Sequence, residues 1–115
     1  MAGRLHRIPV AFYRTQGGAE IVRDWLRNLD PPDRQAVGKD LMRVQYRWPV
    51  GMPLCRPLGE GLWEVRSRLP SHRIARVIFA VTGDRILALH GFVKKTRKTP
   101  PADLALAERR RKEFE

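Results

Sequence analysis

Apolar and polar residues follow strand-like patterns in the second half of the chain. Residues 74–81 are mostly β-branched or otherwise apolar, Thr82-Gly83-Asp84 makes a turn, and residues 85–93 are again largely apolar. Two such runs joined by a short turn are typical of a β-hairpin. A third run, residues 62–69, precedes the hairpin. We therefore expect three consecutive strands connected by short turns.

The first half of the chain carries apolar residues at helical spacing instead. One apolar stripe runs through residues 19–29, which predicts a first helix. Residues 30–33 (DPPD) end that helix and start another, because proline fits the first turn of a helix. Spacings of four, three and four separate the apolar residues of the second helix, which are Val37, Leu41, Val44 and Trp48. Pro49 ends it.

The remaining segments complete the predicted order of elements. Residues 5–13 alternate like a strand, and Pro9 places that strand at a sheet edge or start, because proline donates no hydrogen bond. Residues 50–57 are expected to form a connector broken by proline and glycine, and residues 102–114 a third helix after Thr99-Pro100-Pro101. The order β-α-α-β-β-β-α predicts a small α+β fold with a largely antiparallel sheet, formed as one domain by residues 1–115.

Charge narrows the possible partners. The chain has 23 Lys and Arg residues against 12 Asp and Glu, a net charge of +11, which is typical of proteins that bind nucleic acid or an anionic membrane. The single Cys55 rules out an internal disulfide framework and suits a reducing compartment. No apolar run approaches the roughly 20 residues that span a bilayer, and residues 1–7 lack an apolar signal core. We therefore expect a cytoplasmic protein without membrane association.

Cations concentrate along the predicted strands and at their exit. Arg66 and Arg68 are two residues apart, so they project from the same face of a strand. Arg76 lies in the next strand, and four further cations leave the last one: Lys94, Lys95, Arg97 and Lys98. Such a face indicates a site for polyanions.

Three segments carry a resemblance to a known family. They are GLWEVR at 61–66, RVIF at 76–79 and LHGFVKKTRKTP at 89–100. The chain resembles the phage-derived HigB-like branch of the RelE/ParE toxin superfamily over nearly its whole length, and the third segment is the specific part. The resemblance implies a RelE-like fold and a toxin of a type II toxin–antitoxin pair. RelE and HigB members cut mRNA in the ribosomal A site, whereas ParE members inhibit DNA gyrase without cutting RNA.

The function that this resemblance implies is a ribosome-dependent mRNA endoribonuclease that blocks translation. Its expected partners are mRNA, the ribosome and a cognate antitoxin of helix-turn-helix type, and no cofactor is expected. Two alternatives remain open: a non-catalytic gyrase inhibitor of the ParE type, and an RNA- or ribosome-binding domain that does not cut. A metal is not expected, because the three histidines and Cys55 have no ligand spacing.

Metal-free RNA cleavage sets the roles of candidate residues. The ribose 2′-hydroxyl attacks the adjacent phosphate, which requires a proton acceptor, a proton donor and cations against the developing charge. Arg66 and Arg76 are predicted to grip the phosphate, because a guanidinium binds two phosphate oxygens at once. Lys94 and Lys95 are predicted to move protons, since neighbouring cations lower the pKa of a lysine. Further RNA contacts are expected from Arg68, Arg73, Arg97, Lys98 and Arg110.

The general base remains open at this stage. RelE uses a tyrosine near its C-terminus, and this chain has no tyrosine after Tyr46. His90 is a candidate, because imidazole titrates near pH ~6.5. Each candidate also has a structural interpretation: the arginines can form an ion-paired face with Glu60 or Glu64, His90 can be a hydrogen-bonded core histidine, and Lys94 and Lys95 can steer phosphate without moving protons.

Overall fold

A computed structural model describes residues 7–93 and 98–114 of the chain. Three helices and five strands follow one another as β1 (Val10–Phe12), α1 (Ile21–Arg27), α2 (Pro31–Arg47), β2 (Cys55–Gly59), β3 (Leu62–Arg68), β4 (Ile74–Thr82), β5 (Arg85–Val93) and α3 (Pro101–Phe114). The predicted α+β class is confirmed, and so is the order of elements apart from one additional strand.

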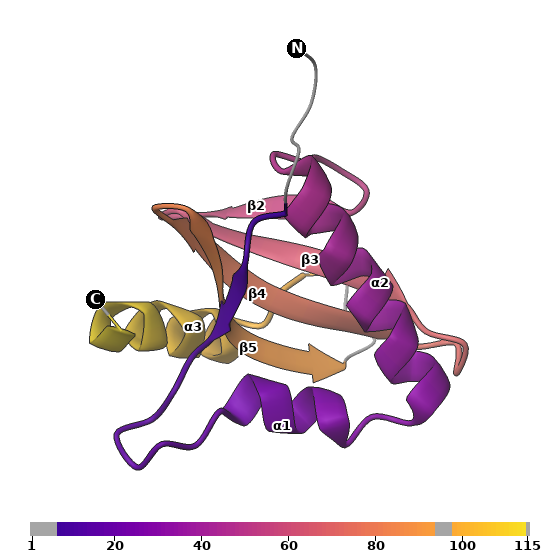
Figure 1. Cartoon of the computed structure of the whole chain (residues 1–115), viewed down its shortest axis with the longest axis horizontal. Coiled ribbons are helices and arrows are strands. Elements are labelled where there is room, and N and C mark those ends of the chain that lie inside the picture. Colours follow the sequence, from indigo (N-terminus) through magenta and orange to yellow (C-terminus); the bar gives the residue numbers. More distant parts are fainter. Residues whose placement is uncertain (1–6, 94–97, 115) are drawn as a thin grey trace.

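The five strands form one sheet in the order β1-β5-β4-β3-β2 (Figure 1). The pairs β2–β3, β3–β4 and β4–β5 are antiparallel, and only β1 pairs in parallel, with β5. The hairpin predicted around Gly83 joins β4 to β5. The first strand is shorter than predicted, and it lies at a sheet edge as Pro9 indicated.

The two faces of the sheet are covered by different helices, because side chains alternate between faces along each strand. Val37, Leu41 and Val44 of α2 pack with one face, together with Val22 of α1. Ala107 and the partly buried Leu104 of α3 pack with the other face. That second face of β3 and β4 carries Leu62 and Ile78, and it also carries the charged residues described below.

The additional strand β2 corrects the prediction of a connector over residues 50–57. Its main chain pairs with β3 from Cys55 opposite Val65 to Gly59 opposite Leu62. The prolines hid this strand in the sequence, yet Pro57 is tolerated because β2 is an edge strand that needs no donor on its outer side. Burial of Cys55, which is 0% exposed, ties the strand to the core.

Gly91 allows α1 to lie close to β5. A Cβ atom added at Gly91 would sit 2.4 Å from Cε3 of Trp25, far inside van der Waals contact. The indole of Trp25 therefore occupies the space that any other side chain at position 91 would fill. This contact holds the first helix, which is shorter than the predicted 19–29, against the strand that ends at Val93.

Candidate functional site

Three arginines lie on adjacent strands of the sheet. Arg66 of β3 is the direct cross-strand partner of Arg76 of β4. Arg56 of β2 lies opposite Glu64, which is two residues before Arg66 and so shares its face. We call these four residues, Arg56, Glu64, Arg66 and Arg76, the arginine cluster.

A buried ion pair forms the centre of the arginine cluster. Arg76 is 1% exposed and Glu64 is 0% exposed, and Arg76 Nε lies 3.9 Å from Glu64 Oε1. Thr99, just before α3, donates a hydrogen bond from its hydroxyl to Glu64 Oε2. The carboxylate thus links β3, β4 and the segment that leads into α3. Because an uncompensated charge in the protein interior costs free energy, the buried carboxylate of Glu64 stays beside Arg76.

The arginine cluster holds more positive than negative charge. Burial lowers the pKa of Arg76, Glu64 raises it, and the nearby guanidinium groups of Arg66 and Arg56 lower it again. Arg66 is half-buried, and its Nε has no hydrogen-bond acceptor among the residues that the structure describes. Three guanidinium groups around one carboxylate repel one another, so an added anion such as a phosphate would be stabilised there.

Arg66 and Arg68 lie together, as their spacing predicted. Both side chains line an open groove between α2 and the end of β3. Arg76, in contrast, is buried beneath the surface instead of being displayed beside them. Of the two arginines predicted to grip a phosphate, Arg66 therefore lines the groove and Arg76 does not.

The lysine segment is only partly covered by the structure. Lys94, Lys95 and Arg97 lie outside the described residues, and Lys98 is exposed. Strand β5, which precedes them, ends next to the arginine cluster, since Val93 pairs with Ala75, the neighbour of Arg76. The chain therefore enters this segment from the strand beside the arginine cluster.

His90 connects β5 to α3. Its Nε2 lies 2.6 Å from Oδ1 of Asp103, and its Nδ1 lies 3.5 Å from Nη1 of Arg110. Because a guanidinium only donates, Nδ1 acts as acceptor and the ring proton sits on Nε2, facing the carboxylate. The ring also stacks on Phe92, with centroids 5.3 Å apart. This geometry is that of a hydrogen-bonded structural histidine, one of the two interpretations of His90 that the sequence allowed.

Two arginines expected to contact RNA have partners within the protein. Arg73 lies with Nη2 3.3 Å from Oδ2 of Asp33, a carboxylate that is 2% exposed and also accepts from Ser71. This pair fastens the turn between β3 and β4 to the start of α2. Arg110 donates a hydrogen bond of 2.8 Å to the carbonyl of Leu89 and lies over the Tyr13 ring. Both side chains hold elements of the fold together.

Sequence reasoning missed Arg56 and Tyr13. Arg56 lies in the segment predicted to be a connector, and its place on the sheet follows only from the pairing of β2 with β3. Tyr13 follows β1 and donates a hydrogen bond to Glu113 of α3. That bond is the main reason that the pKa of Tyr13 is raised, and burial adds to it. The comparison with RelE concerns a tyrosine near the C-terminus, whereas Tyr13 lies near the N-terminus.

Two further observations concern ligands and membranes. Within residues 7–93 and 98–114, His, Cys, Asp and Glu side chains form no group of three that is able to hold a metal ion. In the same part of the chain, no helix has the length and apolar character needed to cross a membrane.

Comparison with known proteins identifies the family. No curated protein matches the chain. A family model described as phage-derived protein Gp49-like (DUF891) matches residues 24–112, from α1 through nearly all of α3. The matched region includes the whole arginine cluster. The chain therefore belongs to the Gp49-like family of phage-derived proteins, a family known for toxins of toxin–antitoxin systems.

Proposed function

We propose that this protein is the toxin of a toxin–antitoxin pair and that it cleaves mRNA on the ribosome, which blocks translation. Family membership supports the toxin role. The arginine cluster supports the proposal of RNA cleavage, because Arg56 and Arg66 lie close enough to Arg76 to lower its pKa and the cluster has one carboxylate for three guanidinium groups, so a phosphate is favoured there. The net charge of +11 adds a long-range attraction for RNA.

The proposed chemistry is attack of a ribose 2′-hydroxyl on the adjacent phosphate. The 2′-oxygen forms a bond to phosphorus, the bond to the 5′-oxygen breaks, and the products are a 2′,3′-cyclic phosphate and a 5′-hydroxyl. Arg66 stabilises the extra negative charge of the phosphorane, and Arg56 assists from the next strand. Arg76 and Glu64 hold the Arg66 strand in register from the interior.

Proton transfer is assigned to Lys94 and Lys95, both of which lie outside the described residues. They directly follow β5, which pairs with β4 beside Arg76. One removes the proton from the 2′-hydroxyl and the other protonates the leaving 5′-oxygen. His90 is not assigned the role of base, because both of its ring nitrogens face partners within the protein.

The cellular setting follows from this activity. A toxin that acts on ribosomes carrying mRNA works in the cytoplasm. Membership of a toxin family supports a partner antitoxin. We assign it to the helix-turn-helix type, with an acidic segment that covers the arginine cluster, since complementary charge favours such a contact.

The test is controlled expression without an antitoxin, followed by mapping of the 5′ ends of mRNA. Translation should stop, and new 5′-hydroxyl ends should appear within coding regions. Arg66→Ala should lower the single-turnover rate on a programmed ribosome by about 10²–10³, and Arg66→Lys should recover only part. Arg27→Ala, an exposed residue of α1, is the matched control and should cut normally.

Two outcomes would contradict the proposed function. Intact transcripts together with DNA breaks would indicate gyrase inhibition of the ParE type. A folded Arg66→Ala protein that cuts at the wild-type rate would remove the arginine cluster from the reaction.

A further inference from the structure

We propose that the groove between α2 and the end of β3 binds backbone phosphates of the mRNA strand, next to the bond that is cut. This inference rests on the proposed function and extends it to how the substrate is held. The groove is open to solvent and encloses about 450 Å³. Nothing in the sequence alone indicated it, because α2 and β3 are far apart in the chain.

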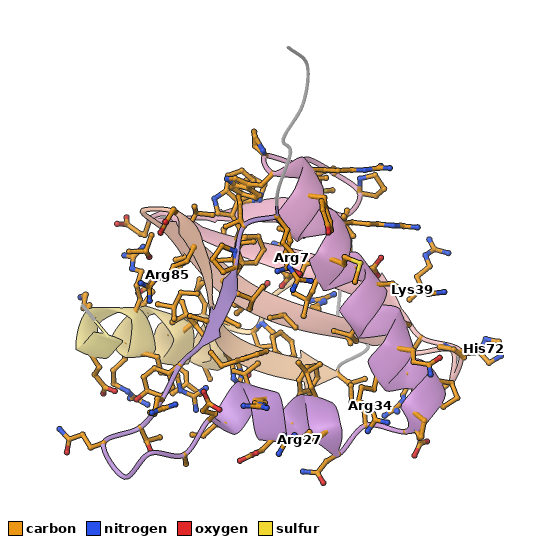
Figure 2. All side chains as sticks on the ribbon, viewed as in Figure 1. Arg7, Arg27, Arg34, Lys39, His72 and Arg85 are labelled. Carbon is orange, nitrogen blue, oxygen red and sulfur yellow. The ribbon has the colours of Figure 1, made fainter. Side chains whose placement is uncertain are left out.

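Cations dominate the walls of this groove. Two come from α2 and two from β3: Lys39, Arg43, Arg66 and Arg68. One carboxylate also lines it, Asp40, whose Oδ1 already lies 3.4 Å from Nη1 of Arg43. The groove therefore keeps a surplus of positive charge after its internal ion pair is counted. Lys39, Arg43 and Arg68 are exposed, so a ligand in the groove can reach all three side chains (Figure 2 labels Lys39 on α2).

The groove is continuous with the arginine cluster through Arg66. The main-chain N–H of Arg66 donates to the carbonyl of Leu54, which ties this part of β3 to a second residue that lines the groove. The Arg66 side chain lines the groove, and the residue pairs across the sheet with Arg76. A strand whose reacting phosphate contacts Arg66 can therefore continue past Arg68, about 7 Å further along β3, toward Lys39 and Arg43.

The other residues that line the groove suit the binding of an RNA strand without recognition of its bases. Pro53, Leu54 and Ile74 supply apolar surface for sugars, and among the described residues that line the groove none is an aromatic on which a base could stack. Contacts to phosphate position a nucleic acid but carry no sequence information. Continuity with the site of phosphate attack favours RNA over an acidic protein segment as the occupant.

The experiment measures binding separately from cleavage. The probe is a fluorescent single-stranded RNA of about 12 nucleotides with 2′-O-methyl groups, which removes the attacking hydroxyl. Its affinity is measured from about 50 to 200 mM salt, because each phosphate contact on a single strand contributes about −0.7 to the slope of log K against log salt. The variant is Lys39→Gln/Arg43→Gln. The control is Arg27→Gln/Arg85→Gln, which removes the same charge from exposed sites elsewhere (labelled in Figure 2).

The groove variant should reduce the size of the salt slope by about 1.4, the loss of two contacts, whereas the control should change it by less than half of that. Equal slopes in the two double variants would overturn the proposal. So would a groove variant that binds the probe normally but loses the antitoxin, since the groove would then belong to a protein partner. A wild-type protein that does not bind the probe at the lowest salt would overturn it as well.

Cleavage of mRNA on a programmed ribosome separates this inference from the proposed function. If Arg66→Ala loses cutting while the groove variant binds and cuts like wild type, the function stands and the groove is not used. If the groove variant loses RNA binding but the wild-type protein never cuts mRNA, the groove binds RNA and the proposed nuclease activity fails.

Discussion

Arg76 and Glu64 offer the sharpest test of how the site is built. Both side chains are almost completely buried, so solvent screens their interaction little. Removing one member of a buried pair typically costs about 3–5 kcal/mol, because the other charge stays in the interior uncompensated. We therefore expect Arg76→Met to lower the free energy of unfolding by about that amount, and Glu64→Gln to cost a similar amount.

The double variant should recover most of that loss. Gln at position 64 keeps an oxygen that can accept from Thr99, and Met at position 76 fills part of the guanidinium space. The double variant should lie within about 2 kcal/mol of wild type, since replacing both members of a buried pair is often nearly neutral. Urea unfolding followed by far-UV circular dichroism gives the four free energies, and Arg68→Met, an exposed residue, should change stability by about 0.5 kcal/mol or less. Losses that simply add in the double variant would refute a coupled pair, because the coupling energy of the cycle would then be zero.

Two further predictions concern stability. Gly91→Ala should cost about 1–3 kcal/mol in urea unfolding, because its Cβ would overlap Trp25, whereas Gly38→Ala in α2 has open space and should stabilise slightly; equal effects would contradict the packing of α1 on β5. Burial raises the pKa of Cys55 to about 11 from its ordinary 9.0, and Asp40 adds to this. Because the folded state holds the thiol proton more tightly than the unfolded state, stability should fall as pH rises from about 9 to about 11. Cys55→Ala should flatten that part of the pH profile, and an unchanged profile would contradict the raised pKa.

The fold was largely predictable because most elements carry a clear local pattern. The hairpin between β4 and β5 has apolar runs around Gly83, and α2 has its apolar stripe and a proline-rich start. The strand β2 was missed because nothing local marks it. Its residues form a strand through pairing with β3 and burial of Cys55, which are long-range effects that no window of sequence contains.

The site was less predictable for the same reason. Spacing alone predicted that Arg66 and Arg68 share a face of the strand, and both residues line the groove. Spacing could not reveal that Arg76 is buried against Glu64, since Thr99 and the covering elements come from elsewhere in the chain. Nor could it show that Arg73 and Arg110 are engaged by Asp33 and by the Leu89 carbonyl.

The distribution of charge in this molecule separates two tasks. Exposed cations outside the groove, such as Arg27 of α1 and Arg85 at the start of β5, produce a field that acts over about a Debye length and attracts any polyanion (Figure 2). The charges of Arg76 and Glu64 are buried and cannot attract a distant ligand. Their contribution is geometric: they fix β3 against β4, so that Arg66 presents its guanidinium at one place on the sheet. Loss of a surface cation should therefore change how fast RNA arrives, whereas loss of the buried pair should change whether the phosphate site exists at all.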